Sequence, residues 1–147
     1  MADTDNGAAV ERFMQALASS DVDAYESTLA EDSTAIYPQS GERFRGRANL
    51  RALMEQFRRD EPFRADVQRV PGDEASWVMS PGFRALRVAG SGEHFTTTGR
   101  VQYANGEEWH LVQLIDVRDG RIRQVISYFA EPFEAPDWRA PFREAQR

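Results

Sequence analysis

The sequence predicts an α+β fold in which helices pack on one face of a strongly curved β-sheet. Apolar residues recur mainly at helical intervals in the first 59 residues, whereas from residue 63 onward the apolar period changes to two. Pro-Gly, Gly-Ser-Gly, Asn-Gly and Asp-Gly turn signals separate the later runs, which indicates successive antiparallel strands. At 147 residues the chain fits a single domain with one sizeable core.

Three helices are expected, at residues 8–19, 21–31 and 47–59. Their apolar side chains recur three and four residues apart, which aligns them on one face of each helix. Asp21 can cap the second helix, because its carboxylate can accept a hydrogen bond from a free backbone N–H. Pro62 ends the third helix. The stripes comprise Val10, Phe13, Met14 and Leu17 in the first helix, Ala24, Tyr25, Thr28 and Leu29 in the second, and Leu50, Leu53, Met54 and Phe57 in the third.

Short runs rich in β-branched and aromatic residues, bounded by turn residues, predict the strands. Pro38 stops the first of them. The path of residues 80–94 stays open, because Ser80-Pro81-Gly82 is either a bulge or a loop. Strands are expected at residues 33–37, 42–45, 63–70, 74–79, 83–88 and 95–103, followed by a hairpin over residues 108–131.

This last hairpin organises the rest of the chain, and its turn is Asp119-Gly120. Both faces of its first strand are largely apolar, so we expect a core or ligand cavity on one face and helices or a partner subunit on the other. Gln113 is the polar residue in the middle of the first face. A two-residue turn would pair Gln113 with Ile126, and a three-residue loop would pair it with Val125. A slip of one residue exchanges the faces, so the register stays open.

Composition excludes several classes of function. The net charge is −6 and there is no basic tract, so a nucleic-acid surface is not expected. The chain has no cysteine, and no apolar run approaches the length of a membrane span. The N-terminus does not look like a signal peptide, so a cytoplasmic protein is the default expectation. His94 and His110 have no carboxylate at a fixed spacing, so no metal site is expected.

Three segments together resemble a known family: residues 10–38 (VERFMQALASSDVDAYESTLAEDSTAIYP), residues 40–57 (SGERFRGRANLRALMEQF) and residues 117–133 (VRDGRIRQVISYFAEPF). In order and spacing they are similar to the nuclear-transport-factor-2-like superfamily, specifically its SnoaL-like branch. The resemblance implies a cone in which a curved mixed sheet wraps the N-terminal helices, encloses an apolar pocket and commonly forms a homodimer. Members include polyketide cyclases, steroid isomerases, epoxide hydrolases, dehydratases and inert binding domains, so fold does not fix function.

We expect three parts along the chain. Residues 1–7 would be a flexible tail and residues 8–131 the cone domain. Residues 132–147 would be an extension that packs on the domain or on a dimer partner, because its prolines oppose regular structure while its aromatic residues favour burial.

When the family's catalytic positions are mapped one by one onto this chain, most of their acidic residues are replaced by other residues. Phe13 stands where the steroid isomerases have an oxyanion-holding Tyr, and Tyr37 stands where they have their general base. Gln113 stands at the position of the second acidic donor, which the cyclases use as their acid/base, and an amide cannot exchange a proton near neutral pH. In the epoxide-hydrolase pattern Arg100 is kept, but Gln102 and Ser127 replace the two Asp residues.

The resulting hypothesis is a cofactor-free protein that binds a small apolar or aromatic, ring-containing metabolite. It is either a cyclase-, isomerase- or hydrolase-type enzyme or a non-catalytic ligand-binding or dimerisation domain. Each candidate also has a purely structural interpretation: Tyr37 as a packing residue, Gln113 bonded internally, Arg100 on the outer face beside an acid. His110 is out of phase with Gln113 and is expected at a surface or interface. The pocket candidates are Tyr37, Gln113, Arg100, Gln102, Ser127, Trp109 and Phe13.

Overall fold

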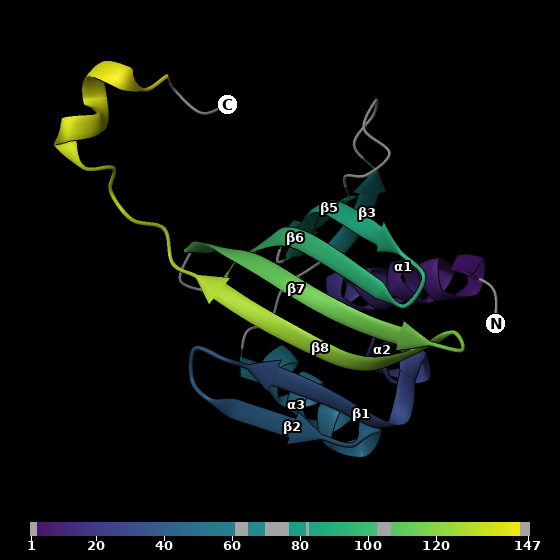
Figure 1. Ribbon diagram of the computed structural model, residues 1–147. Helices are drawn as coiled ribbons and strands as arrows, with labels where there is room; N and C mark the ends of the chain where they lie inside the picture. The colour runs from purple at the N-terminus through teal and green to yellow at the C-terminus, as the bar shows by residue number, and fades with distance from the viewer. Residues whose placement is uncertain (1–2, 61–64, 70–76, 82, 103–106, 145–147) are drawn as a thin grey trace.

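A computed structural model describes residues 3–60, 65–69, 77–81, 83–102 and 107–144 (Figure 1). It confirms the α+β prediction: three N-terminal helices pack behind one curved, unclosed mixed sheet. The elements are α1 (Asp3–Ser19), α2 (Val22–Thr28), β1 (Leu29–Tyr37), β2 (Glu42–Arg45), α3 (Arg47–Asp60), β3 (Ala65–Arg69), β4 (Trp77–Pro81), β5 (Phe83–Ser91), β6 (His94–Gln102), β7 (Glu108–Arg118), β8 (Arg121–Ala130) and the 3₁₀ helix η1 (Asp137–Phe142).

The eight strands lie in the order β2-β1-β8-β7-β6-β5-β4-β3. Every neighbouring pair is antiparallel except β1 and β8, which run parallel although more than 80 residues separate them in the sequence. Helix α1 packs on β3, β4, β5, β7 and β8, and α3 packs on β1 and β2. One side of the sheet is therefore covered by helices, and the other is the outer face seen in Figure 1.

Helix α1 begins at Asp3, so most of the flexible tail expected over residues 1–7 is instead helical. The reason is Asn6, which is 4% exposed and lies against two turns of the sheet. Its amide nitrogen donates to the carbonyl oxygen of Gly92 at 2.9 Å, and its amide oxygen accepts from the backbone N–H of Gly120 at 2.9 Å. A polar side chain thus fixes the start of the helix to the body of the domain.

The second helix is capped as expected but is shorter. The carboxylate of Asp21 accepts from the backbone N–H of Ala24 at 3.0 Å. The helix ends at Thr28 rather than Glu31, because Leu29 already pairs with Ile122 at the start of the parallel β1–β8 ladder. Tertiary pairing here overrides a helical pattern.

The register of the last hairpin differs from both alternatives. Asp119 (φ 53°) and Gly120 (φ 71°) form the two-residue turn, with positive φ at both positions as a type I′ turn requires. The ladder then slips by one residue between Val117 and Asp116, so that Gln113 pairs with Ser127. The slip comes from a β-bulge that leaves Arg123 as the extra residue on β8, and the neighbouring β1–β8 ladder is irregular at the same level.

The open path of residues 80–94 is mostly strand. Strand β5 runs to Ser91, three residues beyond its expected end, and a short turn then leads into β6. Residue 82 and the outer parts of the strands expected at residues 63–70 and 74–79 lie outside the described residues. Within the described part of the chain, no helix is long and apolar enough to cross a membrane.

The C-terminal arm, residues 131–144, leaves the end of β8 and extends away from the domain (Figure 1). Its short helix η1 contains Pro141, so the prolines do not remove all regular structure. Its aromatic side chains stay in solvent: Phe133 is 78% exposed, Trp138 70% and Phe142 84%. In a single chain the arm leaves these rings uncovered, and its packing on a partner subunit stays a prediction.

Candidate ligand-binding site

A cavity of about 700 Å³ lies between the concave face of the sheet and the three helices. Its polar lining consists of phenol, amide and hydroxyl groups, and its wall is otherwise apolar. Exposed Gln39, Ser40 and Gln56 mark its mouth, and buried Gln113 and Ser127 mark its floor. The described lining comprises Phe13, Leu17, Tyr25, Ala35, Tyr37, Gln39, Ser40, Leu53, Met54, Gln56, Phe57, Val101, Trp109, Leu111, Gln113, Val125, Ser127 and Phe129.

Three polar side chains form a row at the floor, of which Gln113 and Ser127 line the cavity. Thr97 on β6, Gln113 on β7 and Ser127 on β8 stand directly opposite one another, because the ladders pair Thr97 with Gln113 and Gln113 with Ser127. They are 1%, 5% and 3% exposed. Thr97 Oγ1 donates to Gln113 Oε1 at 3.2 Å, and Gln113 Nε2 donates to Ser127 Oγ at 3.3 Å. The bulge at Arg123 creates this row, since either expected register would have placed an apolar residue opposite Gln113.

The row leaves hydrogen-bonding capacity at the floor. The Gln113 amide has two N–H donors, of which one is spent on Ser127, and an oxygen with two lone pairs, of which one is spent on Thr97. Ser127 accepts from Gln113, so its own O–H can donate to a ligand. The floor can therefore offer two donors to an oxygen placed between Gln113 and Ser127.

One phenol, Tyr25, lines the wall on the helical side. Tyr25 from α2 is 8% exposed, and its ring centroid lies 5.6 Å from that of Phe13. Burial raises the pKa of the Tyr25 hydroxyl, and the nearby Tyr37 raises it further. Tyr25 therefore stays protonated and can donate. Sequence reasoning did not name it as a site residue, although its place on the inward stripe of α2 was a sufficient signal.

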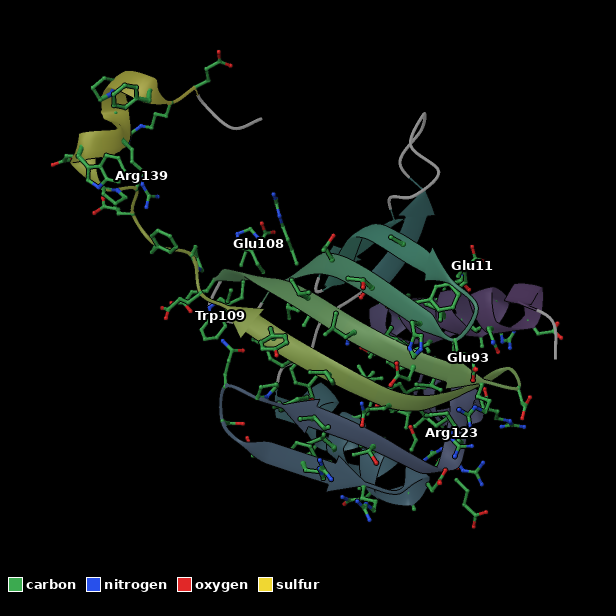
Figure 2. All side chains as sticks on the ribbon, viewed as in Figure 1. Glu11, Glu93, Glu108, Trp109, Arg123 and Arg139 are labelled. Atoms are coloured by element: carbon green, nitrogen blue, oxygen red, sulfur yellow. The ribbon has the colours of Figure 1, made fainter. Side chains whose placement is uncertain are left out.

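The mouth is built by β1, β8 and the turn after β1. The ring of Tyr37 makes edge-on contacts with Phe44 and Phe129, at centroid distances of 5.1 and 5.3 Å. The Gln39 amide bonds to both the N–H and the carbonyl of Phe129, as a neighbouring strand would. Trp109 Nε1 donates to Glu107 at 3.1 Å, at the end of the sheet labelled in Figure 2.

Five of the seven predicted pocket residues line the cavity: Phe13, Tyr37, Trp109, Gln113 and Ser127.

Arg100 does not. It stands opposite His110 on the outer face, where its Nη1 lies 3.2 Å from the carboxylate of Glu108. The physical reason is strand alternation, since Phe95, Thr97, Gly99 and Val101 take the concave positions of β6. The side chain of Gln102 lies outside the described residues.

The two histidines also lie away from the cavity. His94 Nδ1 is 2.8 Å from Asp116 Oδ1 on the outer face, and His110 is exposed there. In the described ranges no three His, Cys, Asp or Glu side chains cluster as a metal site would require. The described cavity lining contains no Asp, Glu, His or Arg. These lining residues can hydrogen-bond and pack, but they have no group that exchanges protons near neutral pH.

Comparison with known proteins agrees with this architecture. The family model for the SnoaL-like domain matches residues 10–125. A crystal structure of an NTF-2-like protein of unknown function from Burkholderia xenovorans LB400 is 31% identical, with a TM-score of 0.74 and coverage of 98% of this chain and 97% of that one. A search of curated proteins returns no match.

Two further solved structures share the fold. A putative ketosteroid isomerase from Kribbella flavida is 19% identical, with a TM-score of 0.73 and coverage of 99% of this chain and 92% of that one. An LEH-like epoxide hydrolase from M. tuberculosis is 21% identical, with a TM-score of 0.56 and coverage of 86% and 84%. The family model spans well over half of the sequence, and the sheet, helices and cavity agree with it: this chain belongs to the SnoaL-like domain family and has an NTF2-like fold.

Proposed function

We propose that this protein binds a small, mainly apolar, ring-containing metabolite that carries an acceptor oxygen at its inner end. The observation that carries the proposal is the row at the floor of the cavity, where Gln113 and Ser127 offer donors inside an otherwise apolar wall. The volume of about 700 Å³ lies within the range of about 300–1,000 Å³ that small-molecule sites occupy.

An uncharged site favours a neutral ligand. A carboxylate or phosphate brought into this cavity would lose its water and find no cation among the described lining residues. A ketone, lactone or ether oxygen would instead accept from Gln113 and Ser127, while its rings contact Phe13 and Leu111. The Tyr25 hydroxyl is a further donor on the helical side of the cavity, for a second polar group.

The alternative is an enzyme, because similar folds include a putative ketosteroid isomerase and an LEH-like epoxide hydrolase. Such reactions move protons and need an acid or base in reach of the ligand. The polar groups of the described lining are phenols, amides, hydroxyls and one indole, so binding without proton transfer is the better-supported function. A purely structural module is less well supported, because the cavity is open rather than filled by side chains.

The test is native mass spectrometry of the protein purified from its own host. We expect one small neutral molecule per chain, released on denaturation. The Gln113→Leu variant should lose the molecule, or bind it at least about tenfold more weakly, because a buried polar contact is worth about 1.5 kcal/mol. Gln124→Leu is the matched control, since Gln124 lies on the outer face beside Asp116 and should leave retention unchanged.

Two outcomes would contradict the proposal. One is retention that is equal in the Gln113→Leu and Gln124→Leu variants. The other is turnover of the bound molecule by the wild-type protein with a bell-shaped pH profile near neutrality, which would establish the enzymatic alternative.

A further inference from the structure

We infer that Thr97 is a positioning residue that fixes the hydrogen-bond polarity of the cavity floor, so that the site selects a carbonyl group over the corresponding alcohol. This selectivity rests on the proposed function and deepens it, because it names the chemical group that binds beside Gln113 and Ser127. Thr97 is not among the described lining residues of the cavity, so it acts through Gln113 rather than on the ligand.

The first observation is the surroundings of Thr97. Strands β5, β6, β7 and β8 lie side by side, and their ladders set Val88, Thr97, Gln113 and Ser127 in one line across the sheet (Figure 1). Val88 packs against the core and has no polar side-chain group to offer. Thr97 is 1% exposed, so water is excluded as well. Among the described residues, the hydrogen-bond partner of the Thr97 hydroxyl is therefore Gln113, at 3.2 Å.

The second observation is the direction of the Gln113 amide. An amide oxygen can only accept and an amide nitrogen can only donate, whereas a threonine hydroxyl can do both. The Gln113 oxygen lies toward Thr97, where it accepts the hydroxyl proton. If the amide were turned over, Thr97 would accept from the nitrogen, and its own buried proton would have no acceptor among the described side chains around it. A buried donor without a partner is costly, so Thr97 holds the nitrogen toward β8.

The third observation is the side on which the cavity lies. Ser127 lines the cavity and Thr97 does not, so the cavity borders the row at its β8 end, toward which the amide nitrogen points. Gln113 Nε2 donates to Ser127 Oγ at 3.3 Å, which leaves the Ser127 proton for a ligand. The hydrogen bonds thus run in one direction, from Thr97 through Gln113 to Ser127, and they end in donors at the cavity.

This polarity distinguishes a carbonyl from a hydroxyl group. A carbonyl oxygen brings lone pairs and no proton, so it accepts from both Gln113 and Ser127. An alcohol brings a proton of its own, and only one proton can lie between its oxygen and Ser127 Oγ. The amide oxygen, which could accept the other proton, faces Thr97. One hydroxyl proton is then left without an acceptor in the row, and sites built on hydrogen bonds discriminate on this ground.

The first test measures the amide orientation without any ligand, by nuclear Overhauser effects in the full chain containing isotope-labelled glutamine. The side-chain N–H signals of Gln113 are assigned by their absence in Gln113→Leu. In the wild type and in Thr97→Ser, these protons should give stronger effects to Ser127 than to residue 97. In Thr97→Val both orientations place one amide group against a methyl, so the two effects should become comparable. Thr96→Val, the same change at an exposed position opposite Leu114, is the control and should match the wild type.

The second test measures selectivity by calorimetric titration with fluorenone and fluorenol, neutral ring molecules that differ only in the carbonyl or alcohol group. The wild type should bind fluorenone about tenfold more tightly than fluorenol. Thr97→Val should reduce this ratio to about threefold or less, because the amide can then turn its oxygen to the alcohol. Thr97→Ser should restore the ratio and Thr96→Val should keep it. A merely structural role of Thr97 would weaken both molecules alike and leave the ratio unchanged.

The outcomes separate this selectivity from the proposed function. Wild-type amide protons that lie nearer Thr97 than Ser127 overturn the role of Thr97, whatever the cavity binds. A fluorenone preference that both Thr97→Val and Thr97→Ala retain overturns it too, and leaves the proposed function standing. Thr97→Ala removes the same hydroxyl and decides the question if Thr97→Val does not fold. Fluorenone binding that is absent, or unchanged in Gln113→Leu, contradicts the proposed function itself, and the selection of a carbonyl falls with it.

Discussion

Gln113 stands at a position where an ionised carboxylate would lower the stability of the fold. Its amide makes one hydrogen bond to a hydroxyl group on each side, and the residue is 5% exposed. A carboxylate in the same place would face two hydroxyls and no cation among the described lining residues, so its pKa would rise above the usual 4.3 or so of glutamic acid.

The Gln113→Glu variant makes this measurable. Because the folded-state pKa is raised, the variant keeps its full stability below about pH 4 and loses it as pH rises through the folded-state pKa. A rise of two pKa units corresponds to about 2.7 kcal/mol lost at pH 8. Thermal unfolding at pH 5 and pH 8 should show this loss, whereas Gln113→Met, neutral and of similar length, should track the wild type. An identical pH response of the two variants would show that the floor is solvated.

Tyr25 offers a second residue-level test, at alkaline pH. Burial, helped by Tyr37, raises the pKa of its hydroxyl above the ordinary value of 10.0. The neutral phenol therefore contributes full stability below pH 10, and that contribution falls as pH rises further.

In urea titrations above pH 10, the wild type should lose up to about 1.4 kcal/mol per pH unit relative to Tyr25→Phe. Tyr128→Phe removes an exposed hydroxyl and serves as the control, with a pH response like that of the wild type. If Tyr25→Phe weakened with pH as steeply as the wild type, Tyr25 would not be the group responsible.

At the scale of elements, Asn6 joins α1 to the two turns that close β5–β6 and β7–β8. Asn6→Ala leaves the carbonyl of Gly92 and the N–H of Gly120 without this partner. We expect a loss of about 2–3 kcal/mol in the free energy of unfolding, measured in urea, because buried polar groups would lose their hydrogen bonds. Asp5→Ala, at the exposed neighbouring position, should cost less than about 0.5 kcal/mol. Equal losses would mean that Asn6 is not a tether.

The elements also show where sequence reasoning succeeds. Periodicity located the helices and most strands, and Asp119-Gly120 was correctly expected as the turn of the last hairpin, although its length was left open, because these signals are local. The bulge at Arg123 was missed, since the extra residue is a surface Arg that leaves no mark in the apolar pattern. The end of α2 was missed because its competitor, the pairing of Leu29 with Ile122, is distant in sequence.

The same limit applies to the site. Gln113 was singled out because a polar residue in the middle of an apolar strand face needs a partner. Its actual partners, Thr97 and Ser127, depend on ladders that the sequence does not specify. The family pattern led to the prediction that Arg100 lines the pocket. Alternation along β6 instead directs its side chain outward to Glu108, as in its structural interpretation.

At the scale of the whole molecule, the cavity between sheet and helices gives up apolar packing and leaves room for a ligand. Ala35 on β1 lines the cavity with the smallest apolar side chain that has a Cβ. Ala35→Phe should fill part of the roughly 700 Å³, keep or slightly raise the melting temperature through added apolar burial, and abolish retention of the bound molecule.

Ala52→Phe is the control for this variant, since it adds the same ring at an exposed position of α3. It should leave retention unchanged in native mass spectrometry. Undiminished retention in Ala35→Phe would place the molecule somewhere other than this cavity.

The parallel pairing of β1 with β8 has a consequence for how the protein is made. Among the described strands, β1 is the first in the sequence, but its long hydrogen-bonded neighbour, β8, is the last. The β1–β2 hairpin must therefore wait with one edge unpaired until β8 has been synthesised. Completion of this sheet accordingly waits for β8, and until then the exposed edge of β1 is the place where a holding chaperone would be most useful.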